Sequence, residues 1–151
     1  MEDLFVTYQP SLSLKELGFN EPCFGKYTIG VYHPNFNQDR TYILDLEMGL
    51  NETFDHNKNE WLPTEWCSAP LYQQAFTFFS EKYNLYAEIY TTTIGGQVDF
   101  TFQIRDLYSE EYIYDNFSAN TGGYFGTFTT EPKTEIECLK KLIEIVKKKN
   151  E

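Results

Sequence analysis

Two adjacent glycines, Gly95 and Gly96, lie between two runs of β-favouring residues, and this feature constrains the fold more than any other. A Gly-Gly pair in this setting is typical of a two-residue type I′ or II′ hairpin turn. If the glycines form the turn, Ile94 faces Gln97, and every other cross-strand pair follows from that one. The sequence therefore predicts an antiparallel hairpin over residues 86–105.

The hairpin register sorts the side chains onto two faces. A slip of one residue would exchange the faces, so the register is well specified. We expect one buried and one solvated face, with a cation–π contact of ~0.5–1 kcal/mol between Tyr86 and Arg105. The apolar face pairs Ala87 with Ile104, Ile89 with Phe102, Thr91 with Phe100 and Thr93 with Val98. The other face pairs Tyr86 with Arg105, Glu88 with Gln103, Tyr90 with Thr101 and Thr92 with Asp99.

Three segments have the pattern of helices. The closing segment repeats apolar residues at 3,4,3 spacing, namely Ile136, Leu139, Ile143 and Val146. Pro132 suits the first turn of this predicted helix. A second, aromatic helix is predicted over 70–83, with Pro70 in its first turn. A shorter helix is predicted over 8–17, followed by Gly18 as its C′ residue.

The remaining strands complete an α+β domain. Residues 26–32 and 41–48 predict a further strand pair, and a fifth strand is predicted in two pieces, 112–114 and 124–128. We predict one layered domain over 1–151, with a mostly antiparallel sheet of about five strands packed against two or three helices. The predicted order is α-β-β-α-β-β-β-α. Residues 51–67 are predicted to form a long loop insertion.

Charge and composition limit the classes of function. The chain has a net charge of -11, with 12 basic and 23 acidic side chains. Six lysines and five glutamates lie in 131–151, which leaves six basic and eighteen acidic side chains in 1–130. No basic cluster in that part could follow a phosphate backbone, so direct nucleic-acid binding is disfavoured. No apolar run approaches the roughly 20 residues of a membrane span, and the N-terminus lacks a signal sequence. We expect a cytoplasmic protein.

Candidate catalytic and metal-ligating residues do not form a recognised motif. Cys23, Cys67 and Cys138 contain no CxxC pair and are expected to be reduced, partly buried thiols. The segment Asp55-x-Asn57-x-Asn59 begins like a calcium loop, but Glu60 replaces the required glycine and Trp66 the bidentate glutamate. Cys67 beside a helix start could be an activated thiol or a packing residue, and the packing role is favoured. We expect no metal, cofactor or catalytic residue.

Tyrosines gather on strand positions that the pattern leaves exposed. Interfaces between proteins are enriched in tyrosine, whereas single-strand nucleic-acid binding needs basic grooves beside the rings. The predicted interaction surface comprises Tyr86, Glu88, Tyr90, Arg105, Tyr112 and Tyr114. The alternative is that another element, or a second copy of the chain in a homodimer, covers these rings.

Three segments together resemble small uncharacterised proteins of phages and prophages of gut bacteria. They are residues 5–24 around Leu14-Lys15-Glu16-Leu17-Gly18-Phe19-Asn20-Glu21-Pro22-Cys23-Phe24, residues 69–83 around Ala69-Pro70 and Gln73-Gln74-Ala75-Phe76, and the closing segment Cys138–Lys147. The chain differs in having Pro10 in the first helix and a longer middle over 35–66. The resemblance implies a phage-related origin and a host bacterial cytoplasm, but no established activity.

Two hypotheses for function follow. The first is a small non-enzymatic interaction protein with an acidic, tyrosine-rich surface, which could inhibit a host nucleic-acid-binding or defence protein by presenting carboxylates in place of phosphates. The second is an enzyme or ligand-binding domain that uses loop 51–67 as a lid over Asp45, Glu47 and His56.

Overall fold

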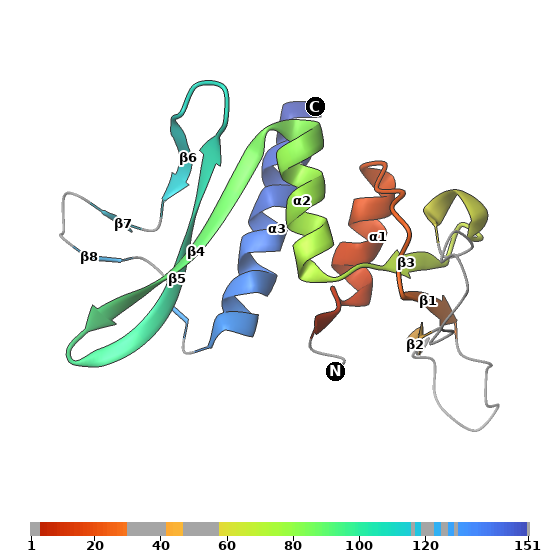
Figure 1. Cartoon of the computed structure of the whole chain (residues 1–151), viewed down its shortest axis with the longest axis horizontal. Helices are drawn as coiled ribbons and strands as arrows, with labels where there is room; N and C mark the ends of the chain where they lie inside the picture. The colour runs from red at the N-terminus through yellow and green to blue at the C-terminus, as the bar shows by residue number, and fades with distance from the viewer. Residues whose placement is uncertain are drawn as a thin grey trace. The chain divides into compact units, whose positions relative to one another are not determined.

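Residues 4–29, 42–46, 58–115, 117–118, 123–124, 127–128 and 130–150 are described by a computed structural model of the chain (Figure 1). They contain three α-helices and two three-stranded antiparallel sheets, so the predicted α+β class is confirmed. The chain divides into two compact units, Met1–Gln74 and Ala75–Glu151, and each is described by itself. The prediction of a single domain stays a prediction.

The first unit packs one helix against a small sheet. Its elements are α1 (Tyr8–Glu16), β1 (Gly25–Ile29), β2 (Tyr42–Leu46), the 3₁₀ helix η3 (Asn59–Trp61) and β3 (Cys67–Ala69). The sheet has the order β2-β1-β3, with both pairs antiparallel. Gly18 has φ = 86° directly after the C-cap of α1, which confirms its predicted role as C′ residue.

Aromatic side chains form much of the first core. The ring of Tyr8 stacks on Tyr42 with centroids 3.4 Å apart, and it meets the edge of Tyr27 at 5.8 Å. The Tyr27 hydroxyl donates a hydrogen bond of 2.9 Å to the Val6 carbonyl, so its polar end is satisfied inside the core. The rings of Tyr8 and Tyr42 pack against a buried cluster that comprises Phe5, Tyr27, Cys67 and Ala69.

Buried Asn59 fixes the described half of the predicted 51–67 loop. Its Nδ2 donates to the Phe19 carbonyl at 2.7 Å, and its Oδ1 accepts from the Ser68 backbone N–H at 2.9 Å. Both bonds are buried, so loss of the side chain would leave the Ser68 N–H unsatisfied and would remove a bond to the Phe19 carbonyl. Residues 51–57 of the predicted loop lie outside the described residues.

Lys15 of α1 adds a second attachment to this segment. Its Nζ donates to the carbonyls of Pro63 at 2.8 Å and Trp66 at 2.6 Å, with a longer contact of 3.4 Å to Leu62. Desolvation by burial lowers the pKa of Lys15. The three carbonyl oxygens offset part of that desolvation, because they replace the water around the ammonium group.

The second unit contains the predicted hairpin. Its strands are β4 (Leu85–Ile94), β5 (Gln97–Asp106), β6 (Tyr112–Asp115), β7 (Phe117–Ser118) and β8 (Gly123–Tyr124), and its closing helix is α3 (Glu131–Asn150). Helix α2 (Tyr72–Tyr83) crosses from the first unit into this one. The predicted pairing from Tyr86–Arg105 to Ile94–Gln97 is confirmed in full, and Leu85 extends it by pairing with Asp106. Gly95 and Gly96 have φ of 60° and 84°, the two positive angles of a type I′ turn.

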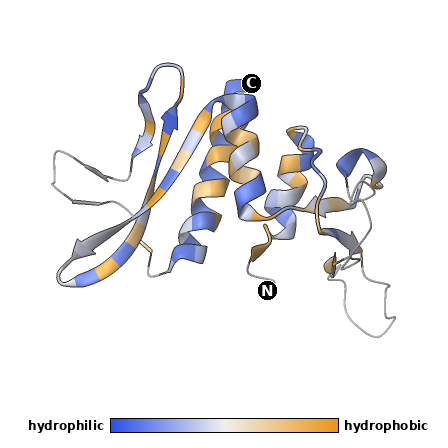
Figure 2. Ribbon diagram, in the orientation of Figure 1, coloured by the Kyte–Doolittle hydropathy of each residue, from blue (hydrophilic) through white to orange (hydrophobic). Residues whose placement is uncertain are grey.

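The hairpin buries one face against α3, which contacts both β4 and β5. Phe102 and Ile104 are buried on this inner face, as the alternation predicted. The prediction is wrong near the turn, where Val98 of the same face is 59% exposed. Apolar and hydrophilic residues alternate along the hairpin strands in Figure 2. The α3 residues that are buried are Thr134, Cys138, Leu139, Leu142, Ile143 and Val146. Leu139, Ile143 and Val146, which belong to the predicted apolar stripe of this helix, are therefore confirmed as core residues.

The strand arrangement differs from the predicted one in two respects. The strands form two separate three-stranded sheets and a β7–β8 pair instead of one sheet of about five strands. The order also gains β3, which the sequence did not reveal because three residues are too few to show an alternation. β3 forms through long-range pairing with β1, in which Cys67 faces Tyr27. Helix α2 begins at Tyr72 and not at residue 70, because Leu71 forms an antiparallel bridge with Phe5 and the Pro70 carbonyl accepts a 2.8 Å hydrogen bond from the Val6 N–H.

In the described part of the chain, no helix is long and apolar enough to cross a membrane.

Replacing Asn59 with alanine should lower the free energy of unfolding by about 2 kcal/mol, because it removes two buried hydrogen bonds to the backbone. Urea titration followed by far-ultraviolet circular dichroism measures this loss. Asn20→Ala is the matched control, since the Asn20 side chain accepts one exposed bond from the Glu60 N–H. An equal loss in both variants would contradict the structural role of Asn59.

Candidate interaction surface

The guanidinium of Arg105 lies between two tyrosine rings on the outer face of the hairpin. Its Cζ is 5.8 Å from the centroid of Tyr86 and 5.7 Å from that of Tyr112. The predicted Tyr86–Arg105 contact is therefore confirmed, and Tyr112 adds a second ring. Tyr86 and Tyr112 remain 43% and 55% exposed. We call Tyr86, Glu88, Gln103, Arg105 and Tyr112 the tyrosine–arginine face.

Arg105 has no carboxylate partner among the described residues. Its Nε is buried and has no hydrogen-bond partner in this part of the structure. The two rings therefore hold the charge through cation–π attraction, worth about 0.5–1 kcal/mol per ring at an exposed site. Nearby Glu88 accepts a hydrogen bond of 2.5 Å from Gln103 on the opposite strand. The rings thus keep Arg105 in place, while no acid among the described residues compensates its charge.

A β-bulge decides which tyrosines of β6 join this face. Arg105 pairs with Tyr112, but Ile104 pairs with Tyr114, so Ile113 is an extra residue on β6. Tyr114 consequently points to the inner face, where its ring stacks on Phe102 with centroids 5.2 Å apart. The prediction that Tyr114 shares a surface with Tyr86 is wrong, because simple alternation does not account for the bulge.

Beyond Glu88 and Gln103, toward the Gly95–Gly96 turn, the outer face of the hairpin is less exposed than the alternation predicted. Thr101 is fully buried and Tyr90 is only partly exposed. Thr127 lies against this end, since its hydroxyl donates a 3.1 Å hydrogen bond to Asp99. Phe128 also exchanges two 2.8 Å backbone bonds with Phe100. The solvated area is therefore concentrated around Arg105.

The turn between β5 and β6, together with the start of β6, adds exposed apolar side chains that the sequence pattern did not predict. Tyr108 is 84% exposed, and Leu107 and Ile113 are also exposed. Asp106 fixes the turn, because its Oδ1 accepts from the N–H groups of Tyr108 at 2.9 Å and Ser109 at 3.2 Å. An aspartate commonly accepts from the backbone N–H two residues further on, so Asp106 itself is a signal for such a turn. We call Leu107, Tyr108 and Ile113 the apolar rim.

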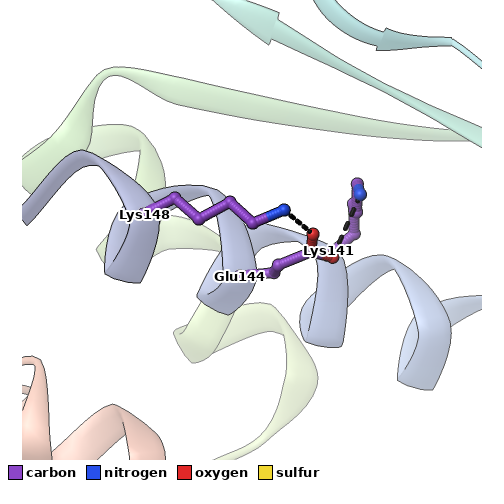
Figure 3. Close-up of polar contacts among 3 residues, drawn as sticks. All are labelled: Lys141, Glu144 and Lys148. Carbon is purple, nitrogen blue, oxygen red and sulfur yellow. Dashed lines mark hydrogen bonds and ion pairs between the residues drawn. The ribbon is translucent and has the colours of Figure 1, made fainter. Parts of the chain in front are cut away.

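The lysines of α3 are largely engaged within the second unit. Glu144 pairs with Lys148 at 2.5 Å and with Lys141 at 3.0 Å, as Figure 3 shows. Hydrogen bonds from both lysines lower the pKa of Glu144. Lys141 also lies 4.9 Å from the ring centroid of Tyr114. These pairs agree with the ordinary role of a solvated helix face.

Of the three side chains in the alternative site, Asp45 alone belongs to the described residues. Asp45 is exposed on β2 with Lys26 Nζ 4.0 Å from its Oδ2, whereas Glu47 and His56 lie outside the described residues. Cys67 lies fully buried in β3, and burial raises its pKa to about 12. A thiol with this pKa is a poor nucleophile at neutral pH. Within the described ranges, no group of three His, Cys, Asp or Glu side chains could hold a metal ion.

All three cysteines lie outside disulfides and are fully buried, so they are more deeply buried than the partly buried thiols that the sequence predicted.

No protein-family model matches the chain, and no curated protein or solved structure is significantly similar to it. The resemblance to phage proteins therefore stays a prediction.

The carboxyl group of Asp106 should titrate below its ordinary pKa of 3.8, because two backbone N–H groups stabilise the charged form. Its contribution to stability is complete above the ordinary pKa and is lost as pH falls through the lowered one. Carboxyl ¹³C shifts recorded against pH measure this titration. Asp106→Ala should speed amide exchange at Tyr108 and Ser109, whereas Asp106→Asn, which keeps the acceptor, should preserve their protection at neutral pH. A carboxyl that titrates at or above 3.8 would contradict this account of the turn.

Proposed function

We propose that the protein is a small non-enzymatic interaction protein that contacts a protein partner through the tyrosine–arginine face. The observation that carries the proposal is Arg105, held between Tyr86 and Tyr112 without a carboxylate partner among the described residues. Tyrosine and arginine are enriched at the energetically dominant positions of protein interfaces. A preformed arrangement of this kind also reduces the entropy lost on binding.

The surroundings of the face favour a basic partner. Acidic side chains surround the exposed tyrosines: Glu88 lies on the face, and Glu110, Glu111 and Asp115 are exposed beside it. Interfaces of proteins commonly have an aromatic centre and a polar rim. Lysine or arginine side chains of a partner would pair with these acids, and an oxygen acceptor of the partner would bind Arg105. The apolar rim would extend the contact.

The finer proposal is that this partner is a nucleic-acid-binding or defence protein in the cytoplasm of a bacterial host. The large excess of acids in residues 1–130 supports it, because carboxylates can occupy a surface that normally binds phosphates. Direct binding of nucleic acid by this chain remains disfavoured on the same grounds.

The test is capture of a host protein on the immobilised protein, compared with the double variant Tyr86→Ser/Tyr112→Ser. Each tyrosine at the centre of an interface can contribute about 2 kcal/mol, so the double variant should bind at least about tenfold more weakly. Trp61→Ser is the matched control, because Trp61 is also a highly exposed aromatic residue but belongs to the first unit. Circular dichroism should show that all three proteins are folded.

Binding should also weaken as salt is raised, since the acids around the face contribute by charge attraction. Equal capture by the wild type and the double variant would overturn the assignment of this face. Capture that does not depend on salt would overturn the finer proposal of phosphate mimicry.

A further inference from the structure

One edge of the β4-β5-β6 sheet lacks the features that usually prevent strands from pairing between molecules. β4 is a terminal strand of the sheet and pairs with β5 over ten consecutive residues without a bulge. Edge strands are normally short, bulged, or supplied with lysine or proline. β4 contains neither residue, and Glu88 is its single charged side chain. The opposite edge differs, because β6 has four residues and a bulge.

The backbone groups along the outer edge of β4 can be identified. Phe100, which faces Thr91, exchanges both of its backbone hydrogen bonds with Phe128 on the side away from β4. In an antiparallel pair, two residues that face each other point their N–H and C=O groups either toward each other or both away from the partner strand. These two arrangements alternate along the strand. Thr91 and the alternate residues Ala87, Ile89 and Thr93 therefore direct their N–H and C=O groups away from β5. In the described part of the chain, no strand other than β5 pairs with β4.

We propose that this edge pairs with β4 of a second copy of the chain, antiparallel across a two-fold axis. The register centred on Ile89 places Ile89 opposite its own copy and Ala87 opposite Thr91. All of these residues have outward N–H and C=O groups, so each pair can exchange two hydrogen bonds. Glu88 then faces Tyr90, whereas a shift by one residue of the centre to Glu88 would place two carboxylates opposite each other. In the register centred on Ile89, two copies of β4 can therefore form hydrogen bonds without placing like charges opposite each other.

A two-fold axis perpendicular to the sheet keeps corresponding faces on the same side. The dimer would form a continuous six-stranded sheet with both copies of α3 on one side. Both tyrosine–arginine faces would lie on the other side. A dimer of this kind would present the face twice, so it could bind a repetitive partner with higher avidity than one copy.

The direct test is amide hydrogen exchange by NMR, measured over a range of protein concentrations. As concentration rises, exchange at Ala87, Ile89, Thr91 and Thr93 should slow by about tenfold or more, because their N–H groups become bonded. The even-numbered amides Glu88 and Thr92 serve as internal controls, since they are bonded to β5 in both states. Light scattering should show a mass approaching twice 17.8 kDa over the same range.

Thr91→Pro should abolish the dimer, because it removes an outward N–H and leaves the pairing with β5 intact. Thr91→Val keeps the N–H and should remain dimeric. A mass of one chain at every concentration would overturn the proposal, as would a dimer whose odd-numbered β4 amides remain unprotected. The exchange experiment on the wild type decides the matter even if the proline variant does not fold.

The dimer and the proposed function can fail separately. Each copy carries a net charge of -11, so dimerisation should strengthen with salt, whereas partner binding should weaken. Tyr86→Ser/Tyr112→Ser should leave the mass unchanged, because neither substitution alters an outward backbone group of β4.

Discussion

The β4–β5 pairing is the constraint on which the second unit depends. Ten consecutive pairs, closed by the Gly95–Gly96 turn, leave no freedom to rotate a side chain from one face to the other. The inner face can therefore be buried by α3, since Phe102 and Ile104 point toward it together. The same register brings Arg105 opposite Tyr86 on the other face. Core and candidate interaction surface are thus two consequences of one set of backbone bonds.

The bulge in β6 gives that surface its composition. Because Ile113 is an extra residue, Tyr112 faces Arg105 while Tyr114 stacks on Phe102. One tyrosine completes the arrangement around the cation, and the other contributes to packing near α3. The position of Arg105 between two rings explains how an arginine without an acidic partner in the described residues is held in one place. The cation–π contacts constrain the side chain and leave its charge available to a partner.

The sequence was sufficient wherever local chemistry specifies the structure. The glycine pair determined the hairpin register, and the apolar spacing of the closing segment identified Leu139, Ile143 and Val146 among the buried residues of α3. Predictions failed where distant pairing decides the outcome. β3 becomes a strand only because β1 lies beside it, and the burial of Thr101 depends on chain that returns near Thr127 and Phe128. Tyr114 was misplaced because a single extra residue in β6 has no clear signature in the sequence.

The hairpin register and the bulge together place Tyr112 and Tyr114 on opposite faces of the sheet. Nuclear Overhauser effects from the two tyrosine rings test this most directly. The account predicts cross-peaks from the Tyr112 ring to the Arg105 side chain, and from the Tyr114 ring to Phe102 and Lys141. Cross-peaks from both rings to Arg105, with none from Tyr114 to Phe102, would contradict it.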